Sequence, residues 1–210
     1  MDLYRAHVLV CCGTGCTSSN SPKIIEEFEK HLAGNKLDKE VKVVKTGCFG
    51  LCAQGPIVVV YPEGAMYTMV HPEDVKEIVE EHLLKGRIVK RLLAGNKEAE
   101  DITKSLDNVD FFTKQKRVAL RNCGIINPEA IEEYIAYDGY KALAKVLTEM
   151  TPEQVIETIK KSGLRGRGGA GFPTGMKWEF ARRSQDDQKY VCCNADEGDP
   201  GAFMDRSVLE

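Results

Sequence analysis

Four cysteines stand in two short segments of the sequence and could together bind a metal. Cys11 and Cys16 belong to the first segment, and Cys48 and Cys52 belong to the second. Thiolates gathered at one point make a metal site. Structural zinc usually takes tighter cysteine pairs than these, whose gaps are four and three residues. The spacing therefore favours a [2Fe-2S] cluster, with a zinc ion or buried or redox-active thiols as alternatives.

Cys12 complicates the choice of ligands. The gap between Cys12 and Cys16 is three residues, the same as the gap between Cys48 and Cys52. Spacing alone therefore leaves Cys11 and Cys12 as alternatives for the first ligand.

A glycine-rich run at residues 163–178, GLRGRGGAGFPTGMKW, could bind phosphate. Glycines let the backbone approach a ligand and point several N–H groups at it. Arg165, Arg167 and Lys177 add positive charge. A helix is predicted to begin near Pro173, and helix N-termini attract anions. The alternative is a surface hairpin, which leaves the interleaved cations without a role.

The same run contains a literal G-x-G-x-x-G pattern at residues 166–171. In a Rossmann fold this pattern follows a strand inside a strand–helix–strand unit. Here the preceding segment is a predicted helix, because Thr151 and Gln154 form a capping box and Gly163 is placed to end it. The sequence therefore argues against a Rossmann domain.

A polar cluster follows residues 189–193, which are predicted to form a buried strand with Cys192 and Cys193 in the core. An amide and carboxylates at a strand end can hydrogen-bond hydroxyl-rich groups such as ribose or ribityl chains. A solvated turn is the alternative. The polar residues are Asn194, Asp196, Glu197 and Asp199.

The elements around the four cysteines predict a small mixed sheet. The strand at residues 4–10 and the strand at residues 41–45 each run directly into a cysteine segment, so both segments would meet at one end of the sheet. Ser21 is expected to cap the first helix. The other predicted elements are helices at residues 21–32 and 72–86 and a hairpin of strands at residues 57–61 and 66–70.

Composition limits the class of protein. The chain has 210 residues, a net charge of −3 and eight cysteines. The balanced charge does not indicate nucleic-acid binding, and no apolar run reaches membrane-span length. We expect no signal peptide and a cytoplasmic location, where eight cysteines favour metal binding over disulfides.

The C-x4-C and C-x3-C segments on this strand order resemble the thioredoxin-like [2Fe-2S] ferredoxin domain. The resemblance covers residues 1–86. It implies that Cys11, directly after the strand, is the first ligand. Cys16, Cys48 and Cys52 would complete the set.

Residues 163–178 and the stretch CNADEGDPGAFMDR resemble the flavin-carrying, NADH-oxidising subunit family of complex I and NAD(P)-linked hydrogenases. The resemblance implies FMN and either NAD(H) or NADP(H) as cofactors. The residues implied to line FMN are Gly166, Arg167, Gly168, Lys177, Asn194, Asp196 and Glu197. Those implied to contact NAD are Gly169, Phe172, Phe180 and, near the nicotinamide, Asp199.

Asp199 departs from the glutamate typical of complex I, and a ferredoxin domain precedes the flavin motifs in one chain. Both features favour the beta subunit of NAD(P)-linked, electron-bifurcating-type iron hydrogenases. The implied partners are an iron hydrogenase or formate dehydrogenase catalytic subunit, a small [2Fe-2S] subunit and a ferredoxin. The family continues with [4Fe-4S] clusters, so we expect the chain to be an N-terminal fragment.

The predicted fold class is α/β (α+β), in three parts. These are a thioredoxin-like [2Fe-2S] ferredoxin domain at residues 1–86, a linker with short helices at residues 87–150, and the N-terminal part of an FMN/NAD(H)-binding domain at residues 151–210. In the linker, residues 95–104 are predicted as a loop or short helix, and Cys123 as a thiol without a ligand role. The expected function is NAD(P)H:acceptor electron transfer as a diaphorase subunit, and no side chain is assigned a catalytic acid–base role. The alternative is a stand-alone [2Fe-2S] carrier or assembly module.

Overall fold

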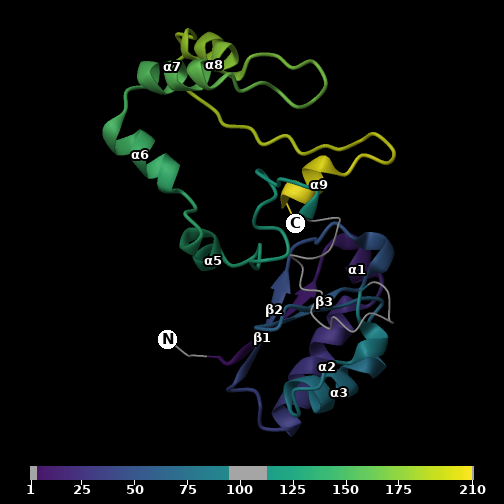
Figure 1. Cartoon of the computed structure of the whole chain (residues 1–210). Coiled ribbons are helices and arrows are strands. Elements are labelled where there is room, and N and C mark those ends of the chain that lie inside the picture. Colours follow the sequence, from purple (N-terminus) through teal and green to yellow (C-terminus); the bar gives the residue numbers. More distant parts are fainter. Residues whose placement is uncertain (1–3, 95–112, 210) are drawn as a thin grey trace. The chain divides into compact units, whose positions relative to one another are not determined.

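The structure, a computed structural model, describes residues 4–94 and 113–209 (Figure 1). It forms two compact units, Met1–Tyr134 with Asp196–Glu210, and Ile135–Ala195. Part of the predicted linker, including the loop or short helix at residues 95–104, lies outside the described residues. No helix in the described ranges is both long enough and apolar enough to cross a membrane.

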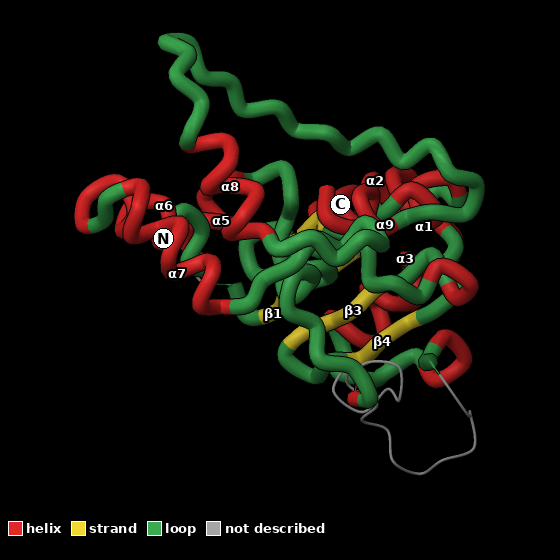
Figure 2. The backbone as a smooth tube through the Cα atoms, turned by 90° about the horizontal axis from the view of Figure 1, so that it is seen from above, coloured by secondary structure: helices red, strands yellow, loops and turns green. Residues whose placement is uncertain are grey.

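The first unit is built on a four-stranded sheet with the order β2-β1-β3-β4. Figure 2 labels β1, β3 and β4 among its yellow strands. β1 (Ala6–Cys11) pairs in parallel with β2 (Val41–Thr46). β3 (Val58–Tyr61) pairs antiparallel with β1 and with β4 (Ala65–Tyr67). Because parallel strands end at the same edge, the segments that follow β1 and β2 begin side by side.

Helices cover one face of this sheet. α2 (Ser21–Gly34) buries Ile24, Phe28 and Leu32, spaced three or four residues apart as one helix face requires. These side chains join Val8 and Val10 of β1 and Val58 and Val60 of β3 in one core cluster. The same cluster includes side chains of α3 (Val75–Glu77) and η3 (Ile78–Leu83). These two helices follow η2 (Pro72–Asp74) directly along the chain. The helices predicted at residues 21–32 and 72–86 are therefore confirmed.

The predicted cap of α2 is wrong by one position. The N-cap is Asn20, in the left-handed conformation with φ 71°, and Ser21 is the first helical residue, fully buried. Asparagine tolerates the left-handed region better than serine does, so the turn into the helix falls on Asn20.

A hydrogen-bonded pair, Tyr67 and His82, lies inside the first unit. The Tyr67 hydroxyl accepts from Val89 N at 3.2 Å and lies 2.7 Å from His82 Nδ1, to which it can donate its proton. Burial lowers the pKa of His82, although Glu63, 3.6 Å from Nε2, opposes this shift. The unfolded chain therefore binds this proton more readily than the folded chain.

We expect the unfolding temperature to fall as the pH drops below about 6.5, the ordinary pKa of histidine. His82→Gln should flatten this dependence, because it removes the titrating group. His71→Gln is the matched control, since the side chain of His71 is 72% exposed. Thermal unfolding between about pH 7.5 and pH 5.5 measures the slopes. Equal slopes in wild type and His82→Gln would contradict the expectation.

The second unit is helical. It holds α6 (Lys141–Glu149), α7 (Pro152–Ser162) and α8 (Thr174–Arg182), and α5 (Ile131–Ala136) precedes them. The predicted capping box is confirmed, because Thr151 Oγ1 accepts from Gln154 N and Gln154 Oε1 accepts from Thr151 N. Gly163, with φ 70°, ends α7 as predicted.

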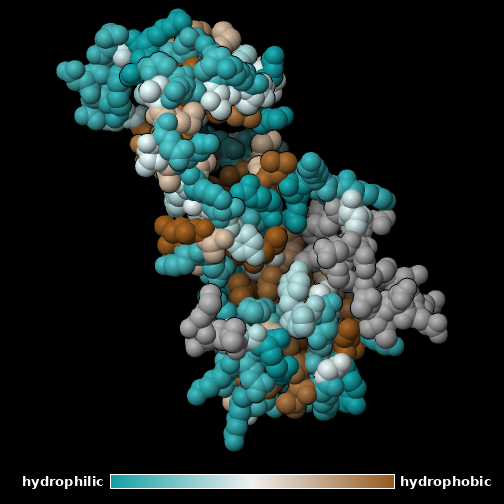
Figure 3. Space-filling model, turned by 60° about the vertical axis from the view of Figure 1, so that its left-hand side comes forward, coloured by the Kyte–Doolittle hydropathy of each residue, from teal (hydrophilic) through white to brown (hydrophobic). Residues whose placement is uncertain are grey.

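The strand predicted at residues 189–193 is absent. This segment is extended but unpaired with any strand, and Val191, Cys192 and Cys193 are exposed rather than buried. A strand needs neighbours to pair with, and the described part of the second unit offers none. Apolar side chains of this segment therefore remain on the surface. Figure 3 shows one face of the molecule, on which hydrophobic residues, in brown, lie among hydrophilic ones.

Candidate functional site

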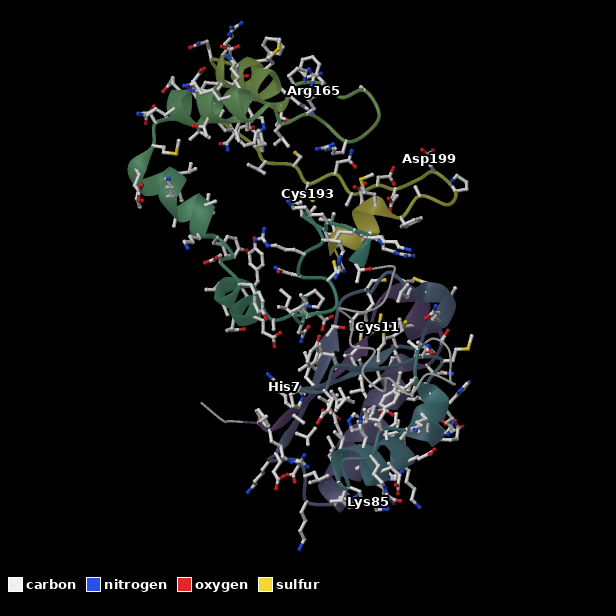
Figure 4. All side chains as sticks on the ribbon, viewed as in Figure 1. His7, Cys11, Lys85, Arg165, Cys193 and Asp199 are labelled. Carbon is white, nitrogen blue, oxygen red and sulfur yellow. The ribbon has the colours of Figure 1, made fainter. Side chains whose placement is uncertain are left out.

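The four predicted ligands lie at one edge of the sheet in the first unit. Cys11 is the last residue of β1, labelled in Figure 4, and Cys16 lies in α1 (Thr14–Ser18). Cys48 follows β2, and Cys52 begins η1 (Cys52–Gln54). The two parallel strands thus deliver two cysteine loops to the same place, as the sequence predicts.

Close contacts within the second cysteine loop and between the two loops bring the cysteines together. Cys48 Sγ lies 3.9 Å from Cys52 Sγ. A Cβ added to Gly13 would lie 2.8 Å from Cys48 Cβ, and one added to Gly55 would lie 2.6 Å from Cys16 Sγ. Each loop therefore places a glycine against a cysteine of the other loop, where any side chain would collide.

The four thiols affect one another's pKa values. A hydrogen bond with Cys16 raises the pKa of Cys11 to about 11, and the same contact lowers the pKa of Cys16. A hydrogen bond with Cys11 is also the main cause that raises the pKa of Cys48. Together with the contact between Cys48 and Cys52, these mutual pKa shifts indicate that the four thiols lie near one another.

The residues present fit a [2Fe-2S] cluster. Four cysteine thiolates are the usual donor set of such a cluster, and Gly50 N already donates to Cys48 Sγ at 3.3 Å. Cys11 and Cys16 are buried, whereas Cys52 is exposed, so the group opens to solvent on one side. In residues 4–94 and 113–209, no three histidine, cysteine or acidic side chains are grouped to hold a single metal ion.

Cys12 belongs to the opposite face of the sheet. Its thiol donates to Val10 O at 3.6 Å and packs against the core under the helices. Cys11 and Cys16 pack with Phe49 in the other cluster of buried residues. The structure therefore separates Cys12 from the group of four sulfurs and favours Cys11 as the first ligand.

The glycine-rich loop of the second unit is closed at its base. Gly166 N donates to Phe172 O at 2.9 Å. Gly169 and Gly171 adopt φ values of 98° and 62°, the left-handed region that favours glycine. Apart from their chain neighbours, no atom of the described residues lies within 4 Å of the positions that a Cβ of Gly168, Gly169 or Gly171 would occupy. The loop therefore offers open space above its backbone.

Two helices hold this loop. A Cβ on Gly175 would lie 2.8 Å from Lys160 N, so α8 packs against α7 at a point where only glycine fits. Phe172 and Phe180, both about half exposed, have ring centroids 6.4 Å apart. The structure thus brings the two predicted adenine-stacking rings together beside the loop.

The predicted acidic contacts Asp196, Glu197 and Asp199 and the glycine-rich loop belong to different compact units. The second unit ends at Ala195, and Asp196 begins the returning part of the first unit. The Glu197 carboxylate accepts from Asp205 N at 2.9 Å and from Arg206 N at 3.1 Å, at the start of α9 (Met204–Leu209). The predicted flavin contacts therefore fall in two units.

Sequence reasoning missed the roles of Gly13 and Gly55, whose only signal was a glycine beside each cysteine pair. It also gave no role to Gly124, which packs against Phe49 of the second cysteine loop.

Two protein families match this chain. The family described as thioredoxin-like [2Fe-2S] ferredoxin matches residues 2–83, and the Nuo51 FMN-binding domain matches residues 159–210. The cofactors named by these families, a [2Fe-2S] cluster and FMN, are the ones that the sequence predicts.

Similar proteins include hydrogenase subunits. NADP-reducing hydrogenase subunit HndC of Solidesulfovibrio fructosivorans is 66% identical over 97 residues, which are 46% of this chain and 19% of that protein. NAD-reducing hydrogenase HoxS subunit alpha of Cupriavidus necator is 35% identical over 167 residues, which are 78% of this chain and 25% of that protein. The chain thus spans about a fifth to a quarter of the length of these relatives.

A small relative is covered almost completely. The 2Fe-2S ferredoxin of Clostridium pasteurianum is 49% identical over 96 residues, which are 42% of this chain and 94% of that protein. The predicted resemblance to the ferredoxin domain and to the flavin subunits is therefore confirmed. Through its N-terminal part, the chain belongs to the thioredoxin-like [2Fe-2S] ferredoxin family.

Proposed function

We propose that this chain carries electrons derived from NAD(P)H, as part of the diaphorase subunit of a multisubunit hydrogenase or formate dehydrogenase. The observation that carries the proposal is the convergence of four cysteines, on two closely packed loops, at one edge of a ferredoxin sheet. A [2Fe-2S] cluster bound there supplies one-electron transfer. The proposed ligands are Cys11, Cys16, Cys48 and Cys52.

The protein positions and shields this site. Cys11 and Cys16 are 1% and 2% exposed, so the sheet excludes water from one side of the group. Cys52 is exposed, and we assign the approach of a redox partner to this side. The Gly50 N–H, which donates to Cys48 Sγ, would stabilise negative charge on that sulfur.

The glycine-rich loop is the proposed phosphate-binding part of an FMN and NAD(P)H site. Bound FMN supplies the change from two-electron hydride transfer to single-electron transfer. The open space above Gly168 and Gly169 supports a close approach of phosphate to the backbone. The proposed FMN contacts are Gly166, Arg167, Gly168, Lys177, Asn194, Asp196 and Glu197. The proposed NAD(P)H contacts are Gly169, Phe172, Phe180 and Asp199.

A stand-alone [2Fe-2S] carrier is the second candidate function. It is favoured by the match to 94% of a small ferredoxin. The proposed partners of the first candidate are a hydrogenase or formate dehydrogenase catalytic subunit, a small [2Fe-2S] subunit and a ferredoxin. A cytoplasmic location is also a proposal.

Visible absorption and low-temperature EPR of the anaerobically reconstituted chain, before and after dithionite, test the proposal. We expect a red-brown protein with one reduced [2Fe-2S] signal. Flavin released on denaturation, together with NAD(P)H-dependent dye reduction, would favour the diaphorase. A cluster without flavin would favour the stand-alone carrier, and a colourless zinc protein would refute both.

A further inference from the structure

Met69 is an exposed apolar residue in a strained backbone conformation. It lies two residues after the end of β4, and its side chain is 60% exposed. Its φ of 51° falls in the left-handed region, which residues other than glycine enter only where surrounding contacts hold them. The fold therefore holds this side chain in solvent against both its backbone preference and the hydrophobic effect.

Two backbone hydrogen bonds fix Met69 to the second cysteine loop. Met69 N donates to Gln54 O at 2.9 Å, and Val70 N donates to Pro56 O at 3.1 Å. Gln54 is the last residue of η1, the turn that begins with Cys52. The strained residue is therefore attached to the turn that carries the exposed proposed ligand.

The chain segments that meet here contain no aspartate, glutamate, lysine, arginine or histidine, although 29% of the chain is charged. These segments are residues 11–22, 46–60 and 64–70. Their exposed members at this place are called the uncharged face, which consists of Cys52, Ala53, Gln54 and Met69. Met69 is its one large apolar side chain.

A charged partner surface would fit the uncharged face poorly. Its charges would lose water on contact and would meet no opposite charge on these four residues, so their desolvation would stay uncompensated. An uncharged partner surface avoids this cost, and its contact with Met69 removes apolar area from water. Methionine is flexible and polarisable, so it adapts its shape to the surface that it meets.

We propose that the uncharged face, with Met69 as its apolar contact, docks a one-electron redox protein whose own surface around its redox centre is uncharged. The inference rests on the proposed function, because it requires an electron carrier at the four cysteines. The step transfers one electron from the reduced cluster to the oxidised centre of the partner, and no bond forms or breaks. Met69 acts by contact with the partner, beside the exposed Cys52.

The test is electron self-exchange of the full reconstituted chain, because a second copy offers the same uncharged face. In a half-reduced sample, the NMR line widths of the β-protons of the ligand cysteines give the second-order rate constant. Met69→Ala and Met69→Gln should each lower this rate constant by roughly three- to tenfold, because both remove apolar contact from each copy. Met69→Leu keeps an apolar side chain and should stay within about twofold of the wild type.

Charges placed on the face test whether this face makes the contact. Gln54→Glu and Gln54→Lys should each lower the rate constant by roughly three- to tenfold, because each charge would face its like in the second copy. Long-range repulsion between whole chains predicts a different result. The lysine variant would then exchange faster than the wild type, because it reduces the net charge of −3. A faster lysine variant overturns the proposal.

Leu84→Ala is the matched control. Leu84 is 50% exposed and follows Leu83, whose carbonyl oxygen accepts from Arg5 at the opposite end of β1 from Cys11. Its loss should leave the rate constant unchanged. Iron content and reduction potential, measured for every variant, separate a docking effect from a change in the cluster itself.

A second readout needs no electron transfer. In the fully oxidised chain, the ε-methyl signal of Met69 should shift as the protein concentration rises, and the methyl signals of Leu84 should not. The proposal is overturned if Met69→Ala and Met69→Gln exchange as fast as the wild type, if Leu84→Ala slows exchange equally, or if the Met69 signal does not shift. A wild-type chain that binds no cluster would instead refute the proposed function.

Discussion

We expect the Cys48→Ala variant to lose the [2Fe-2S] absorption and EPR signals, whereas Cys12→Ala keeps both. Cys48 Sγ accepts from Gly50 N and contacts Cys52 Sγ, another of the four proposed ligands. Cys12 donates to Val10 O on the other face of the sheet. Alanine is the right substitution, because the oxygen of serine can replace a thiolate as an iron ligand.

Iron and sulfide content, measured beside the spectra, separate loss of the cluster from a changed spectrum. Cys12→Ala is matched to Cys48→Ala, since both positions are partly buried and each variant removes one thiol. An unchanged spectrum in Cys48→Ala, or loss of the cluster in Cys12→Ala, would show that the proposed ligand set is wrong.

The meeting of the four cysteines could be predicted because it follows from sheet geometry. Two apolar strands each end at a cysteine segment, and parallel pairing of β1 with β2 puts those ends at one edge. The close packing of Gly13 and Gly55 could not be predicted in the same way. Spacing shows that two loops meet, but the atoms that touch depend on the path of each loop.

Predictions from local sequence patterns were wrong where the structure depends on contacts with other segments of the chain. Residues 189–193 have the composition of a buried strand, yet no strand lies beside them in the described residues of the second unit. Ser21 is a good N-cap by type, but the chain turns at Asn20 instead. The residue types predict phosphate binding by the glycine loop and hydroxyl binding by the polar cluster, and the resemblance adds the cofactors FMN and NAD. A single site made by both segments remains a prediction, because it depends on packing between parts that are distant in the sequence.

The second large effect is expected at Gly55. Its backbone is extended, with φ −73° and ψ 162°, so alanine can adopt this conformation without strain. The obstacle is space, because an added Cβ would lie 2.6 Å from Cys16 Sγ and 3.4 Å from Cys52 O. We expect Gly55→Ala to displace the Cys16 sulfur and to lose most of its cluster, at a cost of about 1–3 kcal/mol in folding stability.

Gly34→Ala is the control for this substitution. Gly34 lies in the last turn of α2 with nothing within 4 Å of the added Cβ, so the same change meets no neighbour there. This variant should keep the full cluster and unfold at the same or a higher temperature, because alanine favours a helix over glycine by about 1 kcal/mol. Iron content and thermal unfolding of both variants decide the outcome. If Gly55→Ala binds as much iron as Gly34→Ala, the two cysteine loops do not pack as closely in the cluster-bound protein as they do here. Glycine at this position would then need another explanation than the approach of Cys16.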